Sequence, residues 1–459
     1  MKELRKSIRV SPFLLVIISF VVIILLASLF LVSPIARNEG TWGSYIDALF
    51  MGAAATCVSG LIPFSNGIIG EYNFFGQLVI LICIQIGGLG FMTILAFVIT
   101  LFRNKLKFKD RYLFSQAVGS SSMSDLVIFV RKIIIISFSF ELIGTLILLP
   151  VFFQIGDFQT SIWYSIFHAI SAYNNAGMDI LGTSSLILGH ANLVAELPLW
   201  AYNYLCVTIM VLVILGGISF LVVADIFTFK KPRQWRVFTK ITLLVTAILI
   251  VSGTAFFMIS EGTKSTNQMT FLQALFQSVT LRTSGFVTYD QSELSPAGFV
   301  LSCFFMFIGG SPLSTAGGIK ITTLFMIVLA MASYFRGKQI VAFKRRYSNN
   351  MVIKAMSLTF LAILIVIVGY LFVASFESSN LAITGQEDVI YEVFSAFGTV
   401  GVTRGITTSL SIGSKLTLMS LMLIGRVGPI TFMQMFQTEI NEATGSARFQ
   451  YVEEDFLIG

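Results

Sequence analysis

The six residues AFGTVG at positions 396–401 decide how this chain must be organised. They are small, apolar or weakly polar and rich in glycine, yet they lie between two long apolar segments. Backbone of this kind is tolerated at membrane depth only where it is buried in protein or borders a water-filled path. Similar stretches occur three more times along the chain, so the sequence predicts a set of four equivalent loops.

The composition indicates an integral membrane protein. Of the 459 residues, 56% are hydrophobic and only 12% are charged, and the mean hydropathy is +0.87. A soluble domain carries about 25% charged residues. Several apolar runs exceed the roughly 20 residues that a helix needs to cross a bilayer. The net charge of +7 would by itself be compatible with binding to nucleic acid, which the distribution of the charges argues against.

Eight membrane-spanning segments are predicted, and together with the loops they indicate an all-α fold. They are residues 11–31, 74–101, 133–153, 198–223, 241–259, 296–332, 356–376 and 416–435. A short amphipathic run and a glycine-bearing loop separate the two members of each pair. The repeating unit is therefore helix, short re-entrant pore helix, polar loop and helix. Four such units in tandem, with eight transmembrane helices and four pore helices, predict one pore with pseudo-fourfold symmetry.

The predicted boundaries follow from this unit. We expect an N-terminus at 1–10, four repeats at 11–102, 131–224, 240–333 and 355–437, and a tail at 438–459. Lysine and arginine accumulate on the cytoplasmic side of membrane proteins, and most of them here fall in segments on one side of the predicted spans. Both termini are thus expected in the cytoplasm of a multi-pass plasma-membrane protein, with all four loops opening outward. Binding of the basic segments to anionic membrane lipid is a lesser expectation. Binding to nucleic acid is not expected.

Each of the four glycine loops is expected to contribute to an ion-binding selectivity filter. The predicted filter residues are Thr56, Cys57, Val58, Ser59 and Gly60 in the first loop; Asn174, Asn175, Ala176 and Gly177 in the second; Arg282, Thr283, Ser284 and Gly285 in the third; and Gly398, Thr399, Val400 and Gly401 in the fourth. Backbone carbonyls on a narrow axis can replace the hydration shell of a potassium ion. The carbonyl end of a short helix favours a cation, and glycine leaves the path unobstructed. A single such loop would be read as a glycine-capped helix end, whereas four on one face favour a ring.

The sixth span is interrupted by a polar segment that is a candidate gate. Its residues are Gly309, Gly310, Ser311, Pro312, Ser314, Thr315, Ala316, Gly317 and Gly318, around Leu313. In a helix, glycine costs about 1 and proline about 3 kcal/mol relative to alanine, so a continuous helix is not expected. The alternative is a simple packing kink. The charges Lys320 and Arg426 lie within predicted spans and join the candidate gate, whereas Arg282 is expected to brace its loop.

Other glycines and charges have plainer interpretations. The second span of each pair is called here the closing span. Glycines in three closing spans, at 87–90, 216–217 and 425–428, are expected to let helices approach closely. Asp47, Asp179 and Glu392 lie near the outer ends of the re-entrant elements. They can attract cations to the pore mouth or serve as solvated surface charge, and the sequence leaves both open.

The chain resembles the Trk/Ktr/HKT superfamily of potassium and sodium transporters, and within it the Ktr membrane subunits (KtrB type). The resemblance rests on SAYNNAGM (171–178), TLRTSGF (280–286), AFGTVGVT (396–403), GGSPLSTAGGIK (309–320) and LIGRVGP (423–429). It spans about residues 11–437. Met178 replaces a frequent phenylalanine, and the first loop is less stereotyped than the fourth. Gly60 stands where sodium-favouring plant relatives often have serine, which favours potassium.

The resemblance implies function and partners. It implies potassium uptake, with sodium dependence left open, through a pore gated by the interrupted segment, with Arg426 beside it. It also implies a homodimer with one pore per subunit, and a cytoplasmic KtrA-type nucleotide-binding ring that senses ATP or ADP. The chain itself lacks a phosphate-binding glycine-lysine motif and a GxSxG nucleophile elbow, so no enzyme activity is expected. The alternatives are a sodium-permeable transporter of the same superfamily, a secondary transporter of a small solute, and a membrane scaffold.

Overall fold

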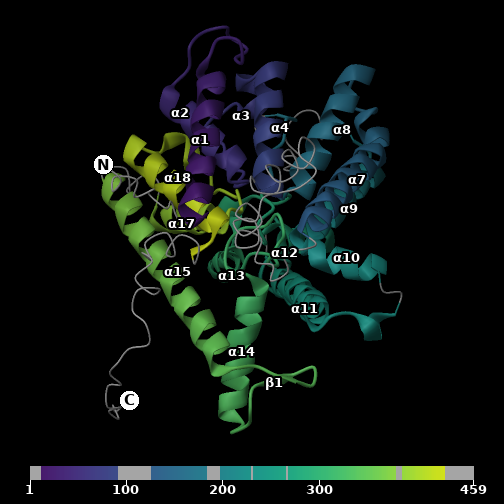
Figure 1. The fold of residues 1–459 in the computed structure, drawn as a ribbon. Coiled ribbons are helices and arrows are strands. Elements are labelled where there is room, and N and C mark those ends of the chain that lie inside the picture. Colours follow the sequence, from purple (N-terminus) through teal and green to yellow (C-terminus); the bar gives the residue numbers. More distant parts are fainter. Residues whose placement is uncertain are drawn as a thin grey trace, which may run out of the picture.

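The computed structural model describes residues 12–90, 126–182, 197–228, 231–264, 267–378 and 385–429. In these ranges the protein is almost entirely helical (Figure 1). The exception is a two-residue antiparallel hairpin of β1 (Val341–Ala342) and β2 (Arg345–Arg346). Three short 3-10 turns also occur, at η1 (Pro232–Gln234), η2 (Gln291–Glu293) and η3 (Thr407–Ser409).

The helices follow one another as four units. The first contains α1 (Pro12–Val32), α2 (Tyr45–Thr56), the one-turn α3 (Gly67–Glu71) and α4 (Phe74–Leu89). The second contains α7 (Leu126–Phe152), α8 (Phe158–Tyr173), α9 (Leu199–Gly217) and α10 (Phe220–Thr228). The third contains α11 (Val237–Ser260), α12 (Phe271–Thr280), α13 (Pro296–Phe307) and α14 (Ile321–Phe335). The fourth contains α15 (Asn349–Phe376), α17 (Gln386–Gly398) and α18 (Ile412–Val427).

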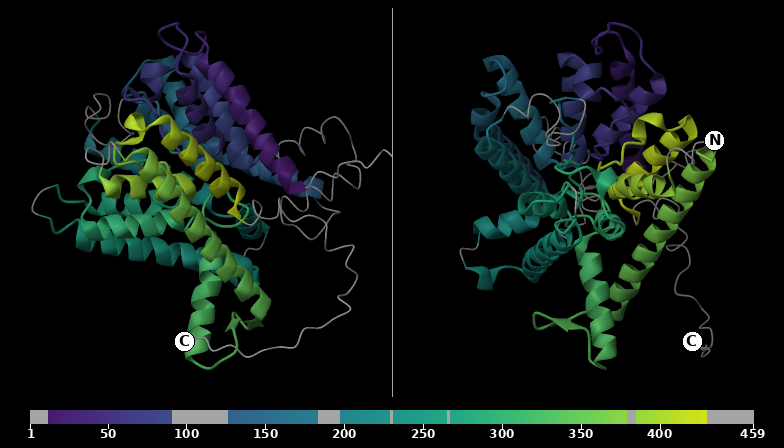
Figure 2. Two further views of the ribbon diagram at one scale, coloured as in Figure 1. Left: turned by 90° about the vertical axis from the view of Figure 1, so that its left-hand side faces the viewer. Right: turned by 180° about the vertical axis from the view of Figure 1, so that it is seen from behind.

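The four units are arranged in a closed circle (Figures 1 and 2). In the first, second and fourth units the short second helix packs against the helices before and after it, and in the third unit α12 packs against α11. Between units, the closing helix contacts the short helix of the next unit. These contacts join α4 to α8, α9 to α12, α13 to α17 and α18 back to α2. The last contact brings the end of the fourth unit against the start of the first.

Each unit contains one short helix that enters the bundle and does not cross it. These re-entrant helices are α2, α8, α12 and α17. Helix α12 has 10 residues, or about 15 Å at 1.5 Å per residue, whereas the hydrocarbon core is about 30 Å thick. Its start is fixed by a capping box between Thr270 and Gln273, which satisfies two otherwise free backbone groups. All four helices end at the glycine loops, so the loops meet inside the bundle.

The closing helices are shorter than the sequence predicted, which is a correction. Three of them were expected as continuous spans over 74–101, 198–223 and 416–435. Instead α4 ends at Gly90 (φ +80°), α9 ends before the extended Ile218, and α18 ends at Gly428 (φ +94°). A left-handed glycine terminates a helix without steric cost. Residues 91–101 and 430–435 lie outside the described ranges.

The third closing helix is interrupted, as the sequence predicted. Residues 308–320, called here the α13–α14 loop, separate α13 from α14. Beyond it, α14 packs against α15 and the β1–β2 hairpin, and these elements extend past the other described helices (Figure 1).

The outer helices are suited to contact with lipid. Within the described residues, four helical stretches are long and apolar enough to cross a membrane: Val130–Phe152, Leu199–Gly217, Val237–Ser260 and Asn349–Phe376. Large side chains on their outer faces are exposed, for example Leu142, Val251 and Phe360. Such exposure is unfavourable in water and favourable in a bilayer. The buried core instead lies between the long helices and the re-entrant ones.

Candidate ion pathway

The four glycine loops meet in a closed ring at the centre of the bundle. Each glycine of the ring lies directly against the carbonyl group that precedes the glycine of the next loop. A Cβ atom added to the glycine would approach that carbonyl oxygen to 2.5 Å or less in every case. The pairs are Gly60 with Ala176, Gly177 with Ser284, Gly285 with Val400, and Gly401 with Ser59. Only glycine fits at these four positions, and the loops touch in cyclic order.

The same alternation of backbone conformation occurs in all four loops. The glycine and the residue two places before it both have positive φ. The angles are +57° and +84° at Val58 and Gly60, +58° and +64° at Asn175 and Gly177, +72° and +89° at Thr283 and Gly285, and +52° and +91° at Thr399 and Gly401. Positive φ is uncommon for residues other than glycine, so four recurrences at one position mark a shared constraint. The residue between them has negative φ in every loop, so the sign of φ alternates in the same way four times.

The N–H groups of the loops are directed back toward their own helices. The residue before each glycine donates its N–H to the last turns of the preceding helix. The bonds run from Ser59 to Ala54 (2.8 Å), Ala176 to Ser171 (2.8 Å), Ser284 to Thr280 (2.9 Å) and Val400 to Ser395 (2.9 Å). These bonds use the donors and leave the carbonyl oxygens of the same residues for the ring.

The third loop differs from the others because it carries a buried cation. The Arg282 side chain is 7% exposed, and its Nε atom has no hydrogen-bond partner among the described residues. It directly precedes the left-handed Thr283. The predicted bracing role of Arg282 stays a prediction.

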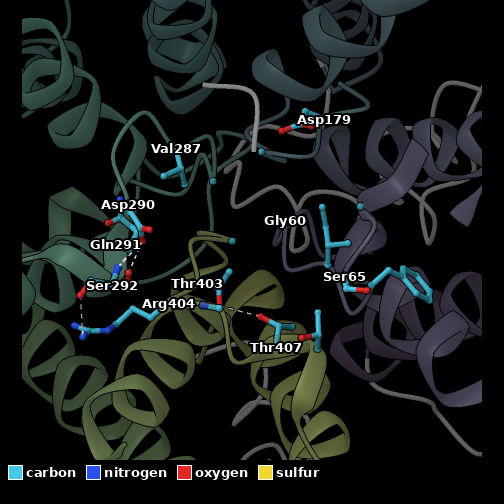
Figure 3. A pocket seen from close by; sticks show the side chains of 18 of the residues that line it. Gly60, Ser65, Asp179, Val287, Asp290, Gln291, Ser292, Thr403, Arg404 and Thr407 are labelled. Carbon is cyan, nitrogen blue, oxygen red and sulfur yellow. Dashed lines mark hydrogen bonds between the residues drawn. The ribbon is translucent and has the colours of Figure 1, made fainter. Parts of the chain in front are cut away.

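A cavity of about 420 Å³ opens outside the ring. All four ring glycines line it, together with the segments that follow them, including Asp179, Asp290 and Arg404. Figure 3 shows Arg404 extending toward Ser292, while Gly60 and Asp179 lie elsewhere around the cavity. Arg404 is paired through Nε with the Asp388 carboxylate at 2.6 Å. The positive charge at the mouth is thereby offset.

Of the three acidic residues noted in the sequence, one lies at this mouth. Asp179 lines the cavity. Asp47 forms an ion pair with Lys415 at 2.7 Å, and Glu392 is fully buried and accepts a hydrogen bond from the Thr407 hydroxyl. The last two therefore hold helices and loops together, and of the two only Glu392 is fully removed from solvent.

The α13–α14 loop is closed at its base by backbone hydrogen bonds. Gly309 N–H donates to the Ile319 carbonyl at 2.8 Å, and Ile319 N–H donates to the Phe307 carbonyl at 3.2 Å. Ile321 N–H donates to the Gly310 carbonyl at 3.1 Å. The residues between them form a loop that leaves the helix axis and returns to it.

This loop lies against the inner side of the glycine ring. The Thr315 hydroxyl donates to the Tyr173 carbonyl at 3.3 Å, and Tyr173 is the last residue of α8, directly before the second glycine loop. Gly317 is in contact with the side chain of Thr399 in the fourth loop. The loop therefore touches the filter segments of two different units.

The broken end of α9 holds the loop from the other side. Ser311 N–H donates to the Gly217 carbonyl at 3.1 Å, and Thr315 N–H donates to the Gly216 carbonyl at 3.2 Å. The Leu313 carbonyl accepts from the Phe220 N–H at 3.1 Å, at the start of α10. Helix ends leave backbone groups unpaired, and here the α13–α14 loop satisfies them.

Two partly buried cations, Arg426 and Lys320, form further hydrogen bonds to this loop. Arg426, in the last turn of α18, donates to the Thr315 carbonyl and to the carbonyls of Gly87 and Gly88, the last at 2.9 Å. Lys320 donates to the Ala316 carbonyl at 2.7 Å. Intramembrane cations are stable where they pair with backbone carbonyls, and the carboxyl end of α4 adds a favourable dipole. Arg426 thus joins three units.

The glycines of the closing helices permit close helix contact, as the sequence indicated. Gly87 faces the Thr56 carbonyl, Gly216 the Tyr173 carbonyl and Gly425 the Phe397 carbonyl, and an added Cβ would clash with each. These carbonyls occupy the same position in three glycine loops, four residues before the ring glycine. The closing helices α4, α9 and α18 are therefore packed directly on the backbone that leads into three of the glycine loops.

One buried polar cluster beside the filter was not identified from the sequence. Glu141 on α7 and Gln85 on α4 are hydrogen-bonded to Asn174 in the second loop. Glu141 lies within the predicted span 133–153, and a carboxylate at such a position is a functional candidate by the same rule that selected Arg426. That signal was present in the sequence and was not used.

The fold and the central ring define a class: a multi-pass helical membrane protein in which four pore-loop units surround one axis. The family model described as "TrkH: Cation transport protein" matches residues 10–444. The chain belongs to this family of cation transport proteins.

Similar proteins are known from several organisms. The potassium/sodium uptake protein NtpJ of Enterococcus hirae is 35% identical over 100% of this chain and 99% of its own length. The Ktr system potassium uptake protein B of Bacillus subtilis is 33% identical over 94% of each chain. The crystal structure of the potassium transporter TrkH from Vibrio parahaemolyticus has a TM-score of 0.69 at 18% identity, covering 94% of this chain and 86% of that one. The predicted family and the all-α fold with four pore-loop units are confirmed.

Proposed function

We propose that this protein takes up potassium across the plasma membrane through the ring of four glycine loops. The observation that carries the proposal is the cyclic contact of Gly60, Gly177, Gly285 and Gly401 with the carbonyl groups of neighbouring loops. A ring of backbone carbonyls is the arrangement that replaces the hydration shell of potassium. The relatives named as potassium uptake proteins support the same ion.

The α13–α14 loop is the gate of this pathway in our proposal. It contacts two filter segments from the inner side, and Arg426 and Lys320 hold it there through backbone carbonyls. An intramembrane loop held by a few hydrogen bonds can move without unfolding the bundle. Release of these bonds would open the path from the filter to the cytoplasm.

Regulation and assembly extend the proposal. The protein forms a homodimer with one pore in each subunit, and both termini are cytoplasmic. A KtrA-type ring that binds ATP or ADP controls the gate from the cytoplasm, and sodium modulates uptake. The protein itself acts as a transporter and not as an enzyme. Its similarity to a Ktr system protein over 94% of both chains supports this assembly.

A sodium-permeable transporter is the second candidate, because one relative is named for both potassium and sodium. The glycine at position 60 favours potassium: a serine there would place a Cβ against the Ala176 carbonyl and change the size of the ring. A secondary transporter of a small solute is less favoured, because such folds usually contain two inverted repeats, whereas these four units form one cyclic set.

The direct test is cation flux in liposomes that contain the purified protein. We expect uptake of rubidium, used as a potassium substitute, above that of protein-free liposomes. Measurements with and without sodium, and with and without the regulatory ring, separate the modes of control. Absence of rubidium flux under all four conditions would refute the proposed function.

A sharper test replaces a ring glycine. In Gly401→Ser, the added atoms must displace the Ser59 carbonyl or distort the backbone. Such overpacking costs about 1–3 kcal/mol, so we expect the preference for potassium over sodium to fall about tenfold. The matched control is Gly405→Ser, which has a similar φ of +97° but nothing within 4 Å of its Cβ position. An unchanged preference in Gly401→Ser would show that the filter is elsewhere.

A further inference from the structure

A buried carboxylate lies directly behind the second glycine loop. Glu141 is 3% exposed and sits in the middle of α7. Its carboxylate oxygens accept from Gln85 Nε2 at 2.9 and 3.2 Å and from Asn174 Nδ2 at 3.0 Å. No ion pair to Glu141 occurs among the described residues. The acceptors of this carboxylate are thus satisfied by two neutral amides, one of which belongs to the filter.

Asn174 is held from several sides at once. Besides Glu141, its Nδ2 group lies within hydrogen-bond distance of Gln85 Oε1 (3.1 Å) and of the Ile170 carbonyl (3.0 Å). Gly88 of α4 leaves room for the amide, because a Cβ at Gly88 would clash with Asn174 Oδ1. Asn174 is the C-cap residue of α8 and is followed by Asn175, which has a left-handed backbone.

The cluster is also linked to the proposed gate. The Gly88 carbonyl accepts from Arg426 at 2.9 Å, and Arg426 also binds the Thr315 carbonyl. The Thr315 hydroxyl in turn donates to the carbonyl of Tyr173, the neighbour of Asn174. A continuous set of contacts therefore runs from Glu141 through the second loop to the α13–α14 loop and back.

The second loop is distinct from the other three in this respect. The residues that correspond to Asn174, three places before the ring glycine, are Cys57, Arg282 and Gly398. None of these is an amide, and no described carboxylate is hydrogen-bonded to any of them. The four backbones have the same alternation of φ, whereas the support behind them differs.

We propose that Glu141, together with Gln85, is a positioning residue that sets the geometry of the second filter loop and thereby the preference for potassium over sodium. This inference rests on the proposed function and adds a residue pair to its site. Glu141 acts through the Asn174 amide and does not contact the permeating ion. Fixing this amide fixes the direction from which the carbonyls of Asn175 and Ala176 approach the axis, and small displacements there change which ion fits.

The test compares rubidium and sodium flux for Glu141→Gln and Glu141→Leu in liposomes. Glu141→Gln keeps one acceptor for Asn174, and we expect the rubidium-to-sodium ratio to fall about threefold. Glu141→Leu removes both acceptors, and the ratio is expected to fall further. The control is Thr145→Val, one turn along α7, because the Thr145 hydroxyl bonds only to the Glu141 backbone carbonyl. This control should leave the ratio unchanged.

A second variant covers the case in which Glu141 variants fail to fold. Gln85→Met removes the amide that supports the carboxylate but leaves the bond between Glu141 and Asn174, so a smaller fall in the ratio is expected. If Glu141 and Gln85 had only a structural role, their variants would have a lower melting temperature and an unchanged rubidium-to-sodium flux ratio. That outcome would overturn the inference. If the unmodified protein carries no rubidium, the proposed function fails; if it does and the variants keep its ratio, the inference alone fails.

Discussion

The closing helix of the third unit and those of the other three units differ in how they stop on the inner side of the glycine ring. All four end or break on the inner side of the glycine ring. In three of them the described helix stops at a single C-cap residue, which is Gly90 for α4, Ile218 for α9 and Gly428 for α18. In the third unit it is a loop of 13 residues, from 308 to 320, long enough to contact the filter segments of two other units. In our proposal, this long loop serves as the movable gate.

This difference assigns different roles to glycines that look alike in the sequence. In α9, Gly216 allows contact between helix and filter backbone, and the contact is rigid. In the α13–α14 loop, Gly309 and Gly318 lie at the closed base of a loop held by a few polar contacts. Substitution of a helix-contact glycine such as Gly216 should therefore lower the stability of the folded protein. Changes in the α13–α14 loop should instead alter ion flux. The following predictions test that division.

The largest effect is expected from filling the contact at Gly216. In Gly216→Ala, the added Cβ would overlap the Tyr173 carbonyl, and the rigid backbone on both sides cannot give way. We expect a loss of about 3 kcal/mol or more, measured as a lower melting temperature and a lower yield of folded protein. The neighbouring Gly217→Ala is the control, because its Cβ would meet only the flexible Asn175 side chain at 3.3 Å. Equal melting temperatures for the two variants would contradict the packing role.

Deleting residues 311–317 is expected to give the next largest effect. The deletion removes the contacts with Tyr173, Gly216 and Gly217 and leaves the glycine ring untouched. Rubidium flux should rise about tenfold or more, with little change in ion preference. Flux that is unchanged or abolished in a folded protein would count against the gate.

A smaller increase is expected for Arg426→Met. The change removes the bonds to Thr315, Gly87 and Gly88 but leaves the contacts of the loop with α9. We expect flux to rise a few-fold. The matched control is Lys415→Met in the same helix, which breaks the ion pair with Asp47. It should lower the melting temperature without raising flux, and a rise in both variants would point to general loosening of α18.

The smallest effect is expected for Lys320→Met. Lys320 binds the Ala316 and Gly317 carbonyls within its own loop and makes no hydrogen bond to another unit in the described part of the chain. Its removal should raise flux less than Arg426→Met does, when both are measured in the same liposome assay. A larger effect than that of Arg426→Met would show that the internal shape of the loop matters more than its attachment.

Much of the fold followed from the sequence because its signals were repeated. The apolar runs and the four glycine loops predicted four units and their order, which the TrkH structural similarity bears out. The predicted break at 309–318 also appears in the structure. The predicted continuity of the other closing spans was wrong, because the sequence alone does not distinguish a glycine that packs within a helix, such as Gly87, from one that ends it, such as Gly90.

Of the candidate site, the sequence predicted the backbone features but not the side-chain contacts. Ring glycines such as Gly401 were found because the loops align, and their roles in ion binding stay predictions. The partners of Glu141 could not be read from sequence, since Gln85 and Asn174 lie 56 and 33 residues away in other elements. Contacts of this kind depend on how units pack around the circle, which periodicity does not encode.

The contact between Gly401 and the Ser59 carbonyl, described above as one of four equivalent steps, also bears on biosynthesis. It joins the last unit to the first, as does the ion pair between Lys415 and Asp47, 368 residues apart. During synthesis the first three units can enter the membrane, but the wall of the pore remains open on one side until the fourth arrives. In our proposal, the conduction path therefore forms only when the fourth unit has entered the membrane, and a product truncated before that unit should carry no selective current.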